Sequence, residues 1–258
     1  MFTLAHMKQL SLLVAFLLSI PAFAVAQAGS HKDSSISMTL VIPSYAFQVP
    51  FVDLKNRFGV NSNIGMNVIY KHKARWFLEA QGCLIFGSNV EQPGLFSNLV
   101  TSQGDIIGTD GKFADVRVFE RGYCITVGGG KIWSAYRPNP NCGFFVSAGA
   151  GYIRHKIKIE DKTDVVPAIQ DDYAKGYDRM TSGFCLRQSV GYIFISNRKL
   201  FNFYVAIEGV EGFTKERRTI NFDEEKGNTS SRTDVLLGFR IGWVLPIFKA
   251  APEKYYLY

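Results

Sequence analysis

Residues 234–245 read DVLLGFRIGWVL, and the chain alternates there between two kinds of side chain. Every second position is large and apolar, namely Val235, Leu237, Phe239, Ile241, Trp243 and Leu245. The positions between them include an acid, an arginine and two glycines, in the order Asp234, Leu236, Gly238, Arg240, Gly242 and Val244. Successive side chains of a strand point to opposite faces, so this stretch predicts a strand with one apolar face and one small, polar face.

The same period of two recurs upstream. In 58–70 the apolar face holds Phe58, Val60, Ile64, Met66, Val68 and Tyr70, and in 75–87 it holds Trp76, Leu78, Ala80, Leu84 and Phe86. Further strands are predicted at 115–133, 179–196 and 200–214. The stretch 37–48 is the weakest strand because Pro43 removes a ladder donor, which a barrel tolerates at a strand end or a bulge.

The stretch 143–159 changes phase near Tyr152. Phe144, Val146 and Ala148 share one parity, whereas Ile153, Ile157 and Ile159 take the other. Either a bulge inserts one extra residue there, or the strand leaves the membrane at that point.

Short turns and long connections alternate along the chain. Turns are predicted at 71–75, 134–142 and 196–200, and long loops at 88–112, 160–178 and 215–232. Outer-membrane barrels have short periplasmic turns and longer outside loops. Counting 37–48 as a strand brings the total to eight and places both termini in the periplasm.

The pattern fits two kinds of barrel. A soluble, lipocalin-like barrel would turn its apolar face inward around a ligand. Glycines recur on the polar face and an export signal precedes the strands, which favours an apolar face turned outward to lipid. We therefore predict an all-β fold, an eight-stranded antiparallel transmembrane outer-membrane β-barrel over 37–247, followed by a periplasmic tail at 248–258.

The N-terminal stretch predicts export. Lys8 precedes an apolar run from Leu10 to Ile20, and small residues follow, so residues 1–26 resemble a signal peptide and 27–36 a leader. The mature chain holds no run of about 20 apolar residues, so no transmembrane helix is expected. The formal net charge of +7 falls to +6 without Lys8 and is spread between strands, which makes nucleic acid a poor candidate partner.

Charged residues on the polar faces are predicted to point into the lumen: Glu79, Glu120, Arg187, Glu208 and Arg240. An eight-stranded barrel is just wide enough inside to be filled by side chains. These residues could line a polar conduit. A self-satisfied plug of paired charges is favoured, because an unpaired buried charge is costly.

Catalytic and metal chemistry have little support. Of the four His, His155 is the one on a membrane strand, and a Ser–His–acid set could use Ser147 or Ser182, although no spacing requires it. The four Cys lack CxxC spacing, so no metal site, cofactor or small-molecule substrate is predicted. Cys83 and Cys124 lie at similar heights on neighbouring strands and could form a disulfide. The glycines at 128–130 before Lys131 lack the spacing of a phosphate loop and fit close backbone packing.

Basic residues gather at the end of the barrel predicted to face the periplasm. The candidate partner-binding residues are Lys71, His72, Lys73, Arg75, Arg137, Arg198, Lys199, Lys249 and Lys254. Such an end could bind an acidic protein surface or lipid phosphates. Ordinary solvated turn charge would give the same composition.

Several short segments, in the order in which they follow one another along the chain, resemble those of a known family. They are Arg75–Ala80 with Phe86–Gly87, Glu120–Gly122, Gly130–Ile132, Pro138–Asn141, Gly151–Ile157, Asp172–Arg179, Gly212–Lys215 and Gly242–Lys249. Over 58–258 the chain resembles the small outer-membrane barrels of Bacteroidota, and within them the PorG component of the type IX secretion system. The four Cys are not part of that pattern.

The resemblance implies a non-enzymatic barrel that ties a periplasmic ring to the outer membrane. The ring would be built from a lipoprotein and a second subunit, PorK and PorN in that system. The alternatives are an outer-membrane lipid-modifying enzyme and a small surface adhesin or channel.

Overall fold

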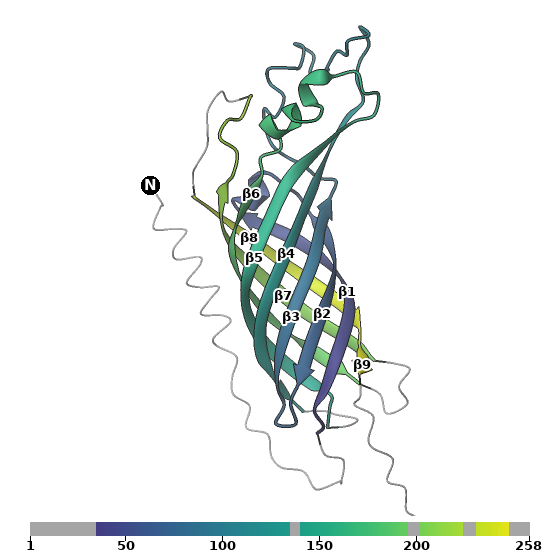
Figure 1. Ribbon diagram of the computed structural model, residues 1–258, viewed down its shortest axis with the longest axis vertical. Coiled ribbons are helices and arrows are strands. Elements are labelled where there is room, and N and C mark those ends of the chain that lie inside the picture. The colour runs from purple at the N-terminus through teal and green to yellow at the C-terminus, as the bar shows by residue number, and fades with distance from the viewer. Residues whose placement is uncertain (1–34, 135–139, 196–201, 224–230, 248–258) are drawn as a thin grey trace, which may run out of the picture. The chain divides into compact units, whose positions relative to one another are not determined.

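The computed structural model describes residues 35–134, 140–195, 202–223 and 231–247. They form one antiparallel sheet that runs around a ring (Figure 1). β1 pairs with β2 on one side and β8 on the other, which closes the predicted eight-stranded barrel. The strands are β1 (Met38–Val52), β2 (Asn61–Lys71), β3 (Trp76–Gly87), β4 (Val116–Trp133), β5 (Gly143–Asp161), β6 (Thr181–Phe194), β7 (Phe203–Glu216), β8 (Ser231–Trp243) and β9 (Leu245–Ile247).

The short strand β9 continues β8 along the same neighbour. β1 pairs with β8 over Ser44–Val52 and with β9 over Thr39–Val41, so this ladder is interrupted opposite Pro43. At the interruption the N–H of Val244 turns to the carbonyl of Asn202 at 3.1 Å. A proline is tolerated inside β1 because the ladder on that side has a gap at its position.

The two ends of the barrel differ in their connections. At the loop end lie the long segment between β3 and β4, the β5–β6 segment with its 3-10 turns η2 (Pro167–Ile169) and η3 (Tyr173–Gly176), and η1 (Leu54–Asn56) between β1 and β2. At the turn end β2 and β3 are joined by residues 72–75. The structure therefore confirms the turn at 72–75 and the long loops after β3 and β5 (Figure 1), whereas the predicted turn at 196–200 and most of the one at 134–142 lie outside the described residues.

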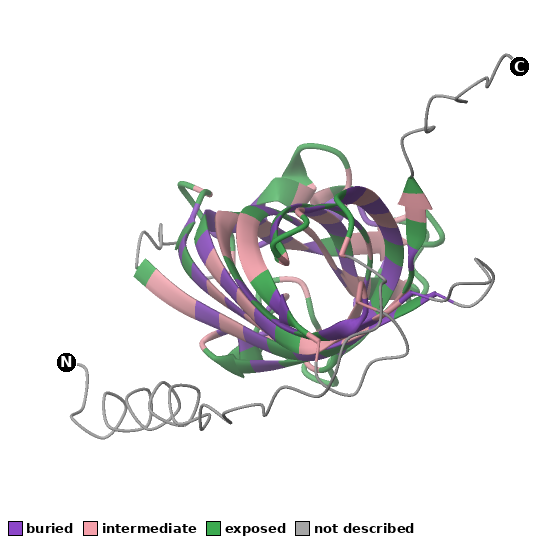
Figure 2. Ribbon diagram, turned by 90° about the horizontal axis from the view of Figure 1, so that it is seen from below, coloured by how far each residue is buried: buried purple, intermediate pink, exposed green. Residues whose placement is uncertain are grey.

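Large apolar side chains cover the outside of the wall. Leu84 is 65% exposed, Val127 63% and Ile125 57%, and the exposed and buried residues alternate along each strand (Figure 2). Soluble monomers rarely expose continuous apolar surface of this extent. The side chains of β8 follow the predicted parity, with Phe239 exposed and Arg240 buried. The arrangement is that of a transmembrane barrel and rules out the lipocalin-like alternative, in which the apolar face points inward.

The interior is polar in the middle and apolar towards both ends, which the sequence analysis did not foresee. The loop-end cluster includes Leu54, Phe58, Leu95, Ile106, Ile153, Ile157, Val166, Ile169 and Tyr177. The turn-end cluster includes Met38, Leu40, Ile42, Ile69, Phe77, Ile132, Phe145, Ile193 and Tyr204. Between the two clusters lie charged and amide side chains.

The phase change in β5 is not a bulge. β5 pairs with β4 in one unbroken register from Phe144↔Trp133 to Asp161↔Val116. Ile153 and Ile157 simply point inward, where they join the loop-end cluster. The strand keeps its parity while the apolar side changes from outside to inside, as expected where β5 rises out of the lipid layer, the second of the two alternatives.

Phe58 differs from its predicted place on the outer face. It lies before β2, which begins at Asn61, and it is fully buried in the loop-end cluster. The turn η1 redirects the chain inward, and the amide of Phe58 bonds to the carbonyl of Leu54 at 2.9 Å. In the described ranges, no helix has the length and apolar character needed to cross a membrane.

Contact of the outer face with lipid can be tested at Val127. The side chain lies midway along β4, opposite the small residues Ala80 and Ala150. We expect Val127→Arg to lower the free energy of unfolding in liposomes by about 2–4 kcal/mol, because a cation near the bilayer midplane is costly. Urea titration followed by tryptophan fluorescence measures this, with Lys131→Arg on the same face as the control. Equal stability of both variants would mean that Val127 does not meet lipid.

Candidate functional site

The middle of the lumen is filled by two ion pairs. Arg240 on β8 bonds Glu208 on β7 through Nε at 2.9 Å and Nη2 at 2.5 Å. Arg187 on β6 bonds Glu79 on β3 from the far side of the barrel. All of these side chains are 4% exposed or less. The charges expected to form a plug are thus brought together as pairs.

Neutral side chains add further hydrogen bonds to these arginines. Arg240 donates to Ser44 Oγ at 2.9 Å and to Asn63 Oδ1 at 2.8 Å, and Arg187 Nε donates to Thr126 Oγ1 at 3.2 Å. The sequence analysis missed Ser44, Asn63 and Thr126 as partners. Each of these residues lies on the polar face of its strand, which already indicates an inward side chain. Which arginine it contacts depends on the strand register, which the sequence does not show.

Glu120 stands apart from the two pairs. Its Oε2 accepts a bond from Asn61 Nδ2 at 2.9 Å, nearer the loop end of the lumen. The predicted cluster therefore consists of two ion pairs and a separate carboxyl–amide contact.

The proposed Ser–His–acid sets are not assembled. Ser147 Oγ lies 2.7 Å from Ser189 Oγ, and Ser182 Oγ accepts a bond from Arg217 Nε at 2.8 Å. His155 instead lies 3.0 Å from Asp234 Oδ2 and 2.9 Å from Thr181 Oγ1, both measured from Nε2. Thr181 Oγ1 also lies 3.1 Å from Nδ1, and the side-chain contacts of Ser147 and Ser182 are to Ser189 and Arg217 instead of the imidazole.

The surroundings of His155 also argue for a structural role. The ring of Phe58 packs edge-on against the imidazole at 5.6 Å between centroids, and His155 is 1% exposed. Thr214 Oγ1 donates to the same carboxylate oxygen of Asp234 at 2.5 Å. The group is a buried polar network beneath the loop-end cluster, with Phe58 packed against the imidazole.

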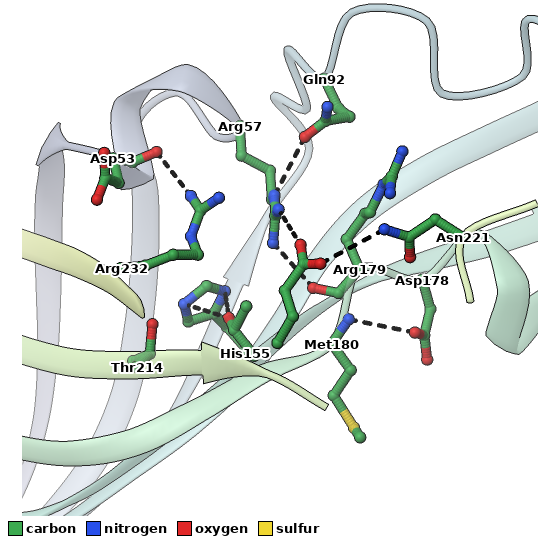
Figure 3. A network of polar contacts seen from close by, with 12 residues as sticks. Asp53, Arg57, Gln92, His155, Asp178, Arg179, Met180, Thr214, Asn221 and Arg232 are labelled. Carbon is green, nitrogen blue, oxygen red and sulfur yellow. Dashed lines mark hydrogen bonds and ion pairs between the residues drawn. The ribbon is translucent and has the colours of Figure 1, made fainter. Parts of the chain in front are cut away.

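A second polar network closes the loop end (Figure 3). Arg57 donates to Glu216 Oε1 at 2.7 Å, to the carbonyl of Arg179 at 2.9 Å and to Gln92 Oε1 at 3.1 Å. Burial lowers the pKa of Arg57, and the nearby charge of Arg232 lowers it further. The contacts with Glu216 act in the opposite direction and retain the cation.

A cavity of about 460 Å³ opens beside this network. It is lined by Asn56, Arg57, Gln92, Pro93, Arg179, Glu216 and Arg232. Around its rim Arg179 pairs with Asp223 at 2.5 Å, and Arg218 pairs with Asp178 at 2.5 Å. The bond to Asp178 raises the pKa of Arg218. Arg57, Arg179 and Arg218 thus each pair with a carboxylate from another segment of the chain, and these pairs tie the loop-end segments to one another.

At the turn end Lys71 is not on the surface. Its Nζ donates to Ser35 Oγ at 2.7 Å, to the carbonyl of Ile36 at 2.9 Å and to Asn141 Oδ1 at 3.0 Å. The residue is fully buried, so a docking partner could not reach it. The prediction of a contact residue is corrected here, because the ammonium instead fastens the chain before β1 across the turn end.

The other predicted partner-binding residues divide into two groups. Lys73 is exposed, Arg75 is half-buried, and His72 stacks on Trp76 with centroids 4.8 Å apart. The remainder, Arg137, Arg198, Lys199, Lys249 and Lys254, lie outside the described residues.

The cysteines remain thiols. Cys83 and Cys124 are direct cross-strand partners, as their heights predicted, yet all four Cys are free and buried. Cys124 Sγ lies 3.7 Å from Cys185 Sγ on the inner face. In the part of the chain that the structure describes, no group of three or more His, Cys, Asp or Glu side chains could hold a metal ion.

The glycines before Lys131 pack against neighbouring backbone. A Cβ on Gly128 would meet the carbonyl of Ala148 at 2.3 Å, and one on Gly130 would meet that of Val146 at 2.3 Å. Close packing inside β4 accounts for these glycines, as expected from the sequence.

Comparison with known proteins gives backbone similarity alone. No family model and no curated protein matches the chain. Solved structures with a similar course are Ail, the attachment invasion locus protein of Yersinia pestis, in complex with the heparin analogue sucrose octasulfate (11% identity, 81% of this chain and 99% of that one, TM-score 0.41), and Neisserial surface protein A (9%, 80% and 96%, TM-score 0.37). The N-terminal β-barrel domain of Pseudomonas aeruginosa OprF is also similar (9%, 83% and 100%, TM-score 0.36).

The ion pair of Arg240 with Glu208 predicts that a single substitution destabilises the barrel more than a double one. Glu208→Gln leaves the Arg240 guanidinium buried without its carboxylate, so we expect a loss of about 3–5 kcal/mol in unfolding free energy. Replacing both partners, Glu208→Leu with Arg240→Met, should recover most of that loss, because no unpaired charge remains. Urea unfolding of the three proteins in the same liposomes measures it. A double variant less stable than the single one would contradict the pairing.

The burial of Lys71 predicts a difference in reactivity between neighbouring lysines. In the folded barrel an amine-acetylating reagent should modify Lys73 and leave Lys71 unmodified, because the Lys71 ammonium is enclosed and donates to its neighbours. Peptide mass spectrometry measures both sites, and labelling after unfolding, where both should react, is the control. Equal labelling in the folded protein would show that the turn end is open.

Proposed function

We propose that this chain is a non-enzymatic outer-membrane barrel of a type IX-like secretion machinery, which ties a periplasmic ring to the membrane. The observation that carries the proposal is the combination of an apolar outer wall with a lumen filled at every level. A protein of this kind is held firmly in lipid and has its accessible polar surface at its two ends. A role as an anchor uses these features directly.

Conduction is the function that the lumen supports least. The loop-end cluster, the ion pairs of Arg187 and Arg240, and the turn-end cluster follow one another along the barrel axis. An ion would have to displace packed apolar side chains twice and break buried ion pairs between them. Eight strands leave little additional space.

The turn end is the surface that would meet periplasmic proteins. Residues 72–75 form a tight turn in which the amide of Arg75 bonds to the carbonyl of His72 at 2.9 Å. The amide of Lys73 bonds to Ser37 Oγ at 2.9 Å, which fixes the turn to the segment before β1. The Lys73 side chain is therefore presented from a rigid base, and a cation there favours an acidic partner surface. The resemblance to the PorG family supplies the identity of that partner, a ring of PorK-like and PorN-like subunits.

A surface adhesin is the second candidate, favoured by one observation at the loop end. Phe113 is 70% exposed and Ile107 53%, and the two residues pair as an isolated bridge in the β3–β4 loop. Exposed apolar side chains on an ordered loop are typical of a recognition surface. Binding of the purified protein to host-cell or glycan surfaces, lost in Phe113→Ser, would support this alternative.

The anchoring proposal predicts a charge-reversal effect. In a variant with Lys73→Glu, Arg198→Glu and Lys199→Glu, we expect capture of the periplasmic ring subunits to fall about tenfold or more, because reversed charge repels an acidic surface. Affinity purification in mild detergent with quantitative mass spectrometry measures this. Lys112→Glu in the β3–β4 loop is the matched control and should capture normally. Undiminished capture by the triple variant, once folded, would refute the proposal.

A further inference from the structure

Basic side chains gather on the outer wall near the loop end. Arg121 on β4, Arg154 and Lys156 on β5, and Lys215 on β7 all stand at outward-facing positions, and Arg217 follows directly after β7. Their parity is fixed by buried neighbours, since Glu120, His155 and Glu216 point inward beside them. We call these cations the basic wall patch. β4 and β5 are neighbours that rise towards the loop end (Figure 1), and β6 separates them from β7.

An aromatic row lies directly below this patch. The rings of Tyr123 and Tyr152 are 6.3 Å apart, Tyr152 pairs in register with Phe184, and Phe184 pairs with Phe213. Tyrosine and other aromatic rings on the outer wall of a membrane barrel mark the level of the lipid headgroups. Arg121 and Arg154 are the next outward-facing residues beyond Tyr123 and Tyr152, so the patch begins at that level.

The patch brings like charges together. Arg121 and Lys156 are direct cross-strand partners on the same face. Like charges directly opposite one another destabilise a sheet. The arrangement is therefore costly unless an anion shares the two cations.

Two carboxylates of the chain act on Arg121 at longer range, but Glu120 points into the lumen and Glu160 is bonded to Lys158. Arg121 donates to the carbonyl of Glu120 at 2.8 Å and lies over the Phe119 ring at 5.1 Å. Arg154 is directed at the thioether of Met180, at 2.7 Å. Arg217 donates to Ser182 Oγ at 2.8 Å. Within the described residues, no ion pair joins a member of the patch to a carboxylate.

Two cations further out on the same strands are paired, unlike those of the patch. Further out along β4 and β5, Arg117 bonds Asp115 at 3.1 Å and Lys158 bonds Glu160 at 2.5 Å. The outward-facing acid Glu211 on β7 lies on the other side of Phe213 from Lys215. Among the described residues at the loop end, the wall cations without a carboxylate contact thus gather just beyond the aromatic row.

We propose that the basic wall patch binds the phosphate groups of a phosphorylated glycolipid in the outer leaflet of the membrane. Its acyl chains would lie along the apolar wall below, against Ile125 and Val127, while its phosphates are shared by Arg121, Arg154 and Lys156. A protein partner fits less well, because the patch lies on the side of the barrel beside the lipid-facing wall. The inference rests on the proposed outer-membrane location with the loop end outside.

The test compares lipid binding by folded barrels in detergent. Native mass spectrometry would titrate the wild-type protein and Arg121→Gln with Lys156→Gln against bisphosphorylated lipid A and the same lipid after enzymatic dephosphorylation. Each cation near an anionic lipid surface contributes about 1 kcal/mol, so the double variant should bind bisphosphorylated lipid about tenfold or more weakly. The dephosphorylated lipid should bind wild type and variant equally weakly.

Lys131→Gln is the matched control. Lys131 is exposed on the same strand and the same face as Arg121, but it lies at the turn end, opposite Trp76. This variant should bind bisphosphorylated lipid as the wild type does. An equal loss in Lys131→Gln, or no loss in the double variant, would overturn the inference. So would displacement of the lipid by millimolar inorganic phosphate, which would assign the patch to a free anion.

The outcome is separable from that of the proposed function. Absence of the protein from the outer-membrane fraction would overturn the location on which both proposals rest. Capture of ring subunits with unchanged lipid binding in the double variant would overturn the lipid site alone. Phosphate-dependent lipid binding without ring capture would uphold the lipid site and overturn the anchor.

Discussion

The structure depends on the closure of the sheet by β1. Inside lipid there is no water to satisfy free N–H and C=O groups, so a membrane sheet must have no open edge. Pairing of β1 with both β2 and β8 removes the edge, and β9 extends the seam past the gap at Pro43. Eight strands make a narrow ring, and its lumen must then be filled by side chains that satisfy one another. The ion pairs of Arg240 with Glu208 and of Arg187 with Glu79 balance the charges in the middle of the barrel.

Filling the lumen moves every accessible polar surface to the outside or the ends. The loop end is held by Arg57, Arg179 and Arg218, each bound to a carboxylate or a backbone carbonyl of another segment. The turn end is held by Lys71, whose ammonium fastens the chain before β1 to Asn141. These cations are structural even though they lie in segments whose composition suggests a binding surface. Lys73, two residues from Lys71, is the exposed cation of that turn, and burial rather than residue type separates the two roles.

The sequence could predict the strands because a period of two is a local property. The faces of β8, the turn at 72–75 and the inward position of Arg187 and Arg240 all follow from alternation alone. The position of a residue along the barrel axis depends on the whole fold and not on its sequence neighbours. The predictions that remained open or were wrong concern this position. Ile153 and Ile157 leave a bulge and an exit from the membrane as open alternatives, because the sequence shows apolar residues changing parity but not that the interior becomes apolar near the loop end. Phe58 was placed on the lipid face because its parity matched β2, although η1 turns the chain inward before β2 begins. The network of His155 depends on Asp234 and Thr214 from other strands, which only the register brings together.

Whether an arginine or lysine of a strand has a carboxylate partner says more about its role than its position in the sequence does. Arg240 and Arg121 both lie in strands, and parity alone distinguishes the inward residue from the outward one. In the lumen a cation without a carboxylate would cost several kcal/mol, so Arg187 and Arg240 each have one. On the outer wall Arg121 and Lys156 face each other at headgroup level without a carboxylate partner in the described residues. Two cations that face each other on the outer wall are stable when an anion from the surroundings lies between them. The phosphate groups of a phosphorylated lipid would provide that anion. The same closure that seals the lumen therefore leaves the outer wall as the place where this barrel can recognise its membrane.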